Sequence, residues 1–166
     1  CSCAIMYRSS VTKTTDGAAT WTDISTHVTE GGINAMDCPT DTDCYGVGFG
    51  VMKSNDAGLL WNMTEDAASS NDIDFINAAI GLKVGGAPAI SLTTDGAGSW
   101  SDKTTGISGG ETFRTVQMID ADTAFVGGNT ALNGAVVYKT TNCATDCTWV
   151  AESTGLLSAV QDMAFL

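Results

Sequence analysis

The segment VTKTTDGAATW at residues 11–21 recurs three more times along this 166-residue chain, as VMKSNDAGLLW (51–61), ISLTTDGAGSW (90–100) and VYKTTNCATDCTW (137–149). The copies end at the four tryptophans of the sequence, which are spaced 40, 39 and 49 residues apart. The last interval is long partly because two extra residues enter the fourth copy near Cys143 and Cys147. A period of about 40 residues is typical of a four-stranded propeller blade.

A second pattern precedes three of the copies and has the form strand, polar turn, strand ending in glycine. It reads INAMDCPTDTDCYGVGFG from Ile33, IDFINAAIGLKVGG from Ile73 and VQMIDADTAFVGG from Val116. Apolar and polar residues alternate in short runs, which is the period of a half-buried strand, and no window sustains the period of a helix. The sequence therefore predicts an all-β fold, a β-propeller built of four-stranded antiparallel blades.

Both ends of the sequence fall inside predicted blades. CAIMYRSS before Val11 is typical of a second strand, and AVQDMAFL (159–166) of a first strand. We expect about four blades, with repeats at approximately 1–30, 31–70, 71–110 and 111–158. Residues 159–166 either close a four-bladed ring or start another blade of a larger ring. We expect the larger ring, because an isolated arc exposes apolar faces and unpaired edges, and because a start at Cys1-Ser2-Cys3 without Met indicates a processed product or part of a longer chain.

Composition limits the partners of this protein. A hydrophobic content of 43% is enough for a core, and no apolar run is long enough for a membrane span, so we expect no direct membrane insertion. The net charge of −12 repels phosphate backbones and anionic lipids, which argues against a nucleic-acid partner. The charge favours solubility or a basic partner.

Six cysteines and a single histidine favour disulfides over a zinc site. Cys38 and Cys44 are separated by five residues, and Cys143 and Cys147 by three, so neither pair has the CxxC spacing of a zinc site. We expect each pair to form a disulfide in an oxidising, extracytoplasmic compartment, while the pairing of Cys1 and Cys3 stays open. Asn62-Met63-Thr64 is a glycosylation sequon that agrees with secretion.

The recurring pattern Ser/Thr-x-Asp-x-Gly/Ala-x-x-Trp resembles the Asp-box, a hairpin of sialidases, sortilin-type receptors, certain glycanases and the photosystem II stability/assembly factor family. A short aspartate at such a turn accepts backbone N–H groups two residues on, glycine tolerates positive φ, and the indole fills the space beneath. Gly17 and Gly96 directly follow the aspartate whereas Gly58 comes two places after it, which allows the local turns to differ. We assign the structural Asp-box role to Asp16 and Trp21, Asp56 and Trp61, Asp95 and Trp100, and Asn142 and Trp149.

Other polar residues have both a functional and a structural interpretation. Repetition of an aspartate in every blade predicts a structural role, since an active site occurs once. Turn formation explains the remaining acidic residues more readily than cation binding does. Three scattered basic residues are expected on the surface. We therefore expect no catalytic residue, no metal site and no cofactor. The acidic residues are Asp37, Asp41, Asp43, Asp120 and Asp122, and the basic residues are Arg8, His27 and Arg114.

Sialidase activity is the first reaction that the Asp-box resemblance suggests. That family uses three arginines and a tyrosine nucleophile assisted by glutamate, but this chain has only two arginines, Arg8 and Arg114. The related glycanases place paired acidic residues in a cleft, and no such pair stands out in this sequence.

Over nearly the whole chain, the sequence resembles the photosystem II stability/assembly factor family. The shared features are the strand ending in VGG or VGFG, the segment KTTDGAATW, and the turn from Cys38-Pro39 to Cys44. The arginine-rich patch of the photosynthetic members is absent. The resemblance implies a non-enzymatic binding or scaffold propeller in the thylakoid lumen or secreted, with a protein partner such as a photosynthetic membrane complex. The alternative is a secreted propeller that binds or hydrolyses glycans.

Overall fold

A computed structural model describes residues 12–23, 32–65, 69–85, 90–107, 109–130, 132, 134–152, 155 and 158–165. Every regular element in these ranges is a β-strand. Among the same residues, none belongs to a helix with the length and hydrophobicity that a bilayer crossing requires. The predicted all-β class is confirmed.

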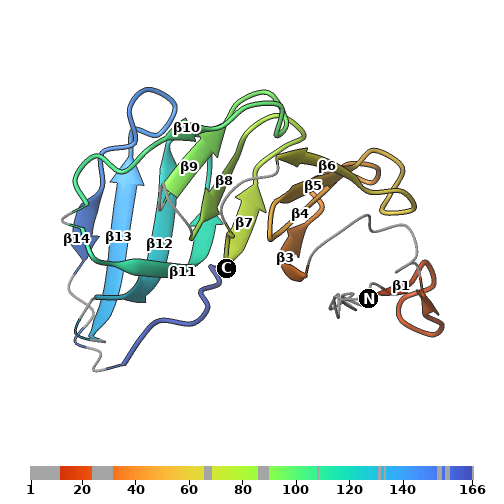
Figure 1. Cartoon of the computed structure of the whole chain (residues 1–166), viewed down its shortest axis with the longest axis horizontal. Coiled ribbons are helices and arrows are strands. Elements are labelled where there is room, and N and C mark those ends of the chain that lie inside the picture. The colour runs from red at the N-terminus through yellow and green to blue at the C-terminus, as the bar shows by residue number, and fades with distance from the viewer. Residues whose placement is uncertain are drawn as a thin grey trace, which may run out of the picture.

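The strands form one two-stranded hairpin and three four-stranded antiparallel sheets, each paired in chain order (Figure 1). The hairpin consists of β1 (Thr12–Lys13) and β2 (Thr22–Asp23), and the next sheet of β3 (Ile33–Asp37), β4 (Cys44–Gly48), β5 (Val51–Ser54) and β6 (Asn62–Glu65). The following sheet consists of β7 (Asp72–Phe75), β8 (Gly81–Val84), β9 (Ile90–Thr93) and β10 (Ser101–Asp102). The last sheet consists of β11 (Thr112–Met118), β12 (Thr123–Asn129), β13 (Ala135–Thr141) and β14 (Val150–Glu152).

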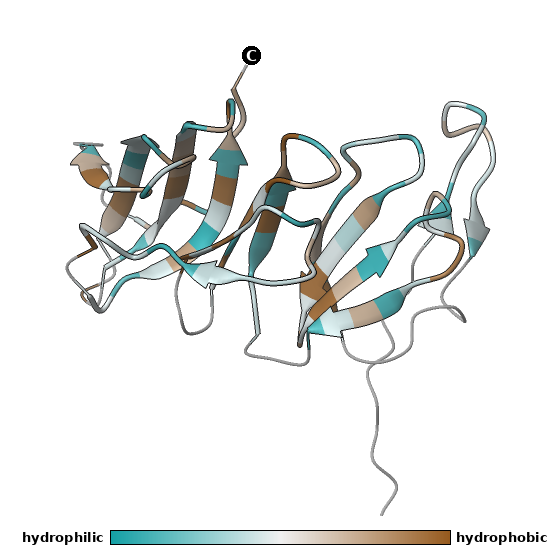
Figure 2. Cartoon of the chain, turned by 90° about the horizontal axis from the view of Figure 1, so that it is seen from above, coloured by the Kyte–Doolittle hydropathy of each residue, from teal (hydrophilic) through white to brown (hydrophobic). Residues whose placement is uncertain are grey.

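The sheets stand side by side in chain order as an arc of a β-propeller (Figure 1 and Figure 2). We number these four units blades 1 to 4 in chain order. The first strands of successive blades, β3, β7 and β11, pack against one another and so lie innermost. Each segment that resembles the Asp-box, called an Asp-box segment below, connects the last two strands of its blade, for example β5 and β6. This placement puts the Asp-boxes on the outer part of the arc.

The core is formed by side chains that meet between adjacent blades. Tyr45 of blade 2 stacks on Phe75 of blade 3, with ring centroids 3.7 Å apart. Between blades 3 and 4, a larger buried cluster includes Leu82, Leu92, Phe113 and Trp149. All residues of β4, β8 and β9 are buried. Because neighbouring blades cover both faces of these strands, even polar side chains such as Lys83 and Ser91 are buried.

Residues 158–165 have no regular secondary structure, but they lie against blade 4 where the inner strand of a next blade would lie. The Val160 N–H donates to the Gly128 carbonyl at 3.0 Å, as the Ser70 N–H donates to Gly48 at 2.9 Å ahead of β7. Figure 1 shows the C-terminal end on the far side of β3–β6 from β1. The only described strand that pairs with β1 is β2. The tail therefore starts another blade position, and the described residues form an open arc without closing into a four-bladed ring.

Candidate functional site

The four Asp-box turns share one hydrogen-bond pattern. In the third copy, the Thr93 hydroxyl donates to Asp95 at 2.9 Å, and the Ser99 N–H donates to the same carboxylate at 2.9 Å. The aspartate carboxylate therefore accepts the N–H of the residue four positions further along the chain, and not two positions further as the sequence analysis predicted. In the fourth copy, the amide oxygen of Asn142 accepts the Thr148 N–H at 2.9 Å, which spans the two extra residues of that turn.

Three of the turns also share an unusual backbone conformation. The two residues after the aspartate both have positive φ, whether they are Gly17 and Ala18, Ala57 and Gly58, or Gly96 and Ala97. The expectation that the different glycine positions allow different turns is therefore wrong. Each turn places one alanine in the left-handed region, at a cost that the repeated hydrogen bonds offset.

Hydrogen bonds hold the Asp-box carboxylates in the ionised form. Bonds from the Thr20 hydroxyl and backbone lower the pKa of Asp16 to about 2, and bonds from the Ser99 hydroxyl and backbone lower that of Asp95 to about 2. The Leu60 N–H lowers the pKa of Asp56 in the same way. Carboxylates with such low pKa values are unsuited to general acid catalysis near neutral pH.

The tryptophans of the motif lie in different surroundings. Trp61 and Trp149 are buried, and their indole N–H groups donate to the Gly58 and Lys103 carbonyls. Trp100 is half-buried and lies edge-on to Phe75. Trp21 is 60% exposed, contrary to the expectation that the indole fills a space beneath its turn.

Two disulfides brace the polar turns. Cys38 is bonded to Cys44, and Cys143 to Cys147. The first links the end of β3 to the start of β4, whereas the second lies inside the fourth Asp-box, where both cysteines are fully buried. The predictions for Cys1 and Cys3 lie outside the described residues.

Inner-strand aspartates form contacts that the sequence did not reveal. Asp37 accepts the Phe75 N–H at 2.8 Å, and Asp74 accepts the Met118 N–H, so equivalent positions connect successive blades. Asp72 accepts the Val116 N–H at 2.9 Å.

Burial raises the pKa of Asp37 and Asp74, and repulsion from Asp72 adds to both shifts. Both joints could have been recognised in the sequence from the repeated spacing Asn-x-x-Asp, at 34–37 and 71–74. Its asparagines, Asn34 and Asn71, also donate to backbone carbonyls of the next blade.

A lysine contact also recurs between blades. Lys13 Nζ donates to the Ala57 carbonyl, and Lys53 Nζ donates to the Gly96 carbonyl at 3.2 Å. Both carbonyls belong to the residue directly after an Asp-box aspartate of the next blade. The lysine precedes its own Ser/Thr-x-Asp/Asn motif in three of the four copies, which was a signal available in the sequence.

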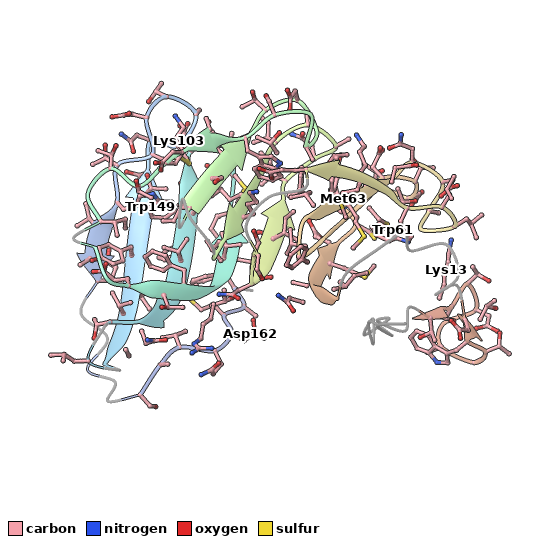
Figure 3. The ribbon with its side chains drawn as sticks, viewed as in Figure 1. Lys13, Trp61, Met63, Lys103, Trp149 and Asp162 are labelled. Carbon is pink, nitrogen blue, oxygen red and sulfur yellow. A yellow bond between two sulfur atoms is a disulfide. The ribbon has the colours of Figure 1, made fainter. Side chains whose placement is uncertain are left out.

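A hollow with a mostly apolar surface lies at the junction of blades 1 and 2 and has a volume of about 460 Å³. Trp61, Met36 and the Cys38–Cys44 disulfide form its apolar wall. Lys13 and Asp41 add one charge of each sign to its edge. Figure 3 shows Lys13 and Trp61 on the two sides of this junction. We call it the junction hollow.

The remaining predicted site residues are scattered. Asp120 accepts the Asp122 and Thr123 N–H groups, and Asp43 accepts two threonine hydroxyls, so both act within turns. Asp122 accepts the Ala144 N–H at 3.2 Å. Arg114 donates to Asn129, and Asn62 is exposed on β6. His27 and Arg8 lie outside the described residues. Within the described ranges, no three His, Cys, Asp or Glu side chains are grouped as metal ligands.

Known proteins resemble the chain in fold. No protein-family model and no curated protein sequence matches it. A structure of YCF48 bound to a D1 peptide superposes with a TM-score of 0.61 and 22% identity over 76% of this chain and 42% of the other. YCF48 from Cyanidioschyzon merolae gives 0.59 and 19%, over 72% and 36%. The GH74 enzyme of Niastella koreensis gives 0.64 and 16%, over 86% and 25%. The chain therefore spans less than half of each of these propellers, and the likeness shows the fold alone.

Proposed function

We propose that this protein is a non-enzymatic binding or scaffold propeller and that it takes a protein segment as its ligand. The junction hollow carries this proposal, because an apolar wall with a few polar groups at its edge suits an extended peptide with an apolar anchor. Trp61 and Met36 supply the wall, and Lys13 and Asp41 supply the edge. The similarity in fold to YCF48, which binds a D1 peptide, supports the same kind of ligand.

The proposal extends to an extracytoplasmic compartment and to a role as a subunit or assembly factor of a photosynthetic membrane complex. Two disulfides support an oxidising compartment. The sequence resemblance to the photosystem II stability/assembly factor family supports the role. The net charge of −12 favours a partner with a basic surface.

One observation supports a second candidate, a glycan-acting propeller. Glycosidases use one carboxyl group with a raised pKa as general acid, and burial raises the pKa of Asp37 and Asp74. Each of these carboxylates, however, accepts a backbone N–H of the neighbouring blade. We therefore rank binding first and assign these two aspartates to the joints between blades.

A peptide-binding experiment tests the proposal. Labelled peptides that tile the D1 sequence are titrated with the protein and followed by fluorescence anisotropy, and a chromogenic glycan panel is assayed in parallel. We expect saturable binding of one peptide and no glycan turnover. Met36→Arg, on the wall of the hollow, should weaken binding at least about tenfold. Leu132→Arg is the matched control, since Leu132 is 93% exposed and is not part of the hollow.

Two results would contradict the proposal. The first is the absence of peptide binding. The second is glycan turnover that Asp74→Asn abolishes, which would establish the glycan-acting alternative.

A further inference from the structure

In blades 1 to 3, the residue directly before the Ser/Thr-x-Asp/Asn motif matches the chemistry of the Asp-box turn that it contacts on the next blade. Lys13 and Lys53 each meet an Asp-box turn whose carbonyl accepts the ammonium group. Leu92 occupies the equivalent position of blade 3, and the turn beyond it contains the Cys143–Cys147 disulfide. Leu92 and both cysteines belong to one buried apolar cluster. A lysine at this position therefore contacts a turn that offers a carbonyl oxygen, and a leucine contacts a turn with an apolar surface.

Lys139 holds the same position on blade 4, and no described strand packs on the face of blade 4 that is turned away from blade 3. Its Nζ lies 5.4 Å from the Phe125 ring centroid, as Lys53 lies 5.2 Å from that of Tyr45. Phe165 of the tail lies on Phe125, with centroids 4.6 Å apart, and so takes the place that Phe75 has on Tyr45. The face of blade 4 thus repeats the face that blade 2 presents to blade 3.

The tail covers only the inner part of this face. Val160 and Met163 lie over Gly127, where an added Cβ would come within 2.9 Å of Val160. Over β13 and β14 there remains a hollow of about 240 Å³, lined by Lys139, Thr141, Thr148, Val150 and Glu152. We call it the outer hollow. At the corresponding place on blade 2, Lys53 receives the turn of the next blade.

The first hairpin carries a turn that matches the outer hollow. Its sequence, TTDGA at 14–18, is identical to the TTDGA at 93–97 that contacts Lys53. Both turns have positive φ at their glycine and alanine. Trp21 of this hairpin is 60% exposed, whereas Trp61 and Trp149 are 0% and 2% exposed against their neighbours. The two ends of the arc therefore present complementary surfaces.

We propose that the outer hollow of blade 4 binds the β1–β2 hairpin of a second copy of this chain. Lys139 Nζ donates to the Gly17 carbonyl of that copy, and Trp21 of the copy is buried against the joint. The contact is head-to-tail, so the copies either close into a ring of two or add further copies to form an open filament. A ring of two copies stays within the range of about four to eight blades that propellers use.

Sedimentation velocity over a range of protein concentrations tests this contact. We expect the wild-type chain to associate in a concentration-dependent manner. Lys139→Glu should weaken association at least about tenfold, because it places a carboxylate against a carbonyl oxygen. Lys103→Glu is the matched control, with the same change of charge at a residue that does not line the outer hollow. Should Lys139→Glu lose its native circular dichroism spectrum, Val150→Arg on the same hollow replaces it, since Val150 is 62% exposed.

A mixing experiment distinguishes this contact from general stickiness. Trp21→Ala damages only the hairpin surface, and Lys139→Glu damages only the outer hollow, so each variant alone should be monomeric. Mixed together, they retain one intact contact and should form a complex of two chains that cannot extend. A wild-type chain that stays monomeric at every concentration overturns the proposal and assigns the face to another occupant, such as a further blade of a longer polypeptide. Association that survives both variants, or a mixture that fails to associate, also overturns it.

Discussion

Aspartates of this chain act in two opposite electrostatic settings. At the Asp-box turns, exposed carboxylates accept several hydrogen bonds, which lower the pKa of Asp16 and Asp95 to about 2. On the inner strands, burial raises the pKa of Asp37 and Asp74. The first group therefore stabilises the folded chain in its charged form, whereas the second group is costly when charged.

These pKa shifts predict a specific acid response. A lowered folded-state pKa contributes stability above the unfolded value of about 3.9, and that stability is lost as the pH falls toward about 2. Asp95→Asn keeps an acceptor oxygen, as Asn142 does naturally, but does not titrate. We expect the difference in unfolding midpoint between the wild type and Asp95→Asn to shrink as the pH falls from about 4 to about 2. Urea unfolding followed by circular dichroism measures it, and a difference independent of pH would contradict the assignment.

The inner-strand aspartates predict the opposite sign. Their raised pKa makes the folded chain gain stability as the pH falls through the folded-state value. Asp74→Asn removes a buried charge but keeps an acceptor for the Met118 N–H, so it should be neutral or stabilising at pH 7. Asp74→Ala leaves that N–H and the Gln117 amide without their acceptor and should cost about 1–3 kcal/mol. Urea unfolding at pH 7 compares the two variants, and equal losses would refute the role of Asp74 as a joint between blades.

At the scale of elements, the same motif residue has different energetic weight in different blades. Trp149 is buried and donates to the Lys103 carbonyl at 2.7 Å, so Trp149→Ala should cost about 3–5 kcal/mol in the free energy of unfolding. Trp21→Ala should cost less than about 0.5 kcal/mol in the monomer, because its indole is largely exposed. Thermal unfolding at low protein concentration makes this comparison. A large loss for Trp21→Ala would show that its hairpin is packed in solution.

Sequence periodicity was sufficient to predict the blades but not the joints between them. The spacing of the tryptophans and the alternation in β3 and β7 identify strands, because these are local properties. The contacts of Asp37 with Phe75 and of Lys53 with Gly96 join residues about 40 positions apart, and they depend on how one blade stacks on the next. The exposure of Trp21 was missed for the same reason, since a motif does not specify what lies against it.

At the scale of the whole molecule, the arc is unequal along its length. Blades 3 and 4 share the largest buried cluster, while both strands of blade 1 are short and largely exposed. In repeat-like folds each unit is stabilised by its neighbours, so units at an open end unfold at lower free energy than central ones. The joint between blades 1 and 2 also contains the open junction hollow, so fewer side chains pack across it.

This difference in burial between the blades predicts a gradient in the rate of amide hydrogen exchange along the arc. We expect amides of β8, β9 and β12 to exchange last, because these strands are wholly or mostly buried and are hydrogen-bonded on both edges. Amides of β1 and β2 should exchange first, by local opening that leaves the other blades folded. Exchange followed by mass spectrometry, in the monomeric Lys139→Glu background, measures the gradient. Uniform protection across all blades would mean that the arc opens only as a whole, and that the joint held by Lys13 is as strong as the core between blades 3 and 4.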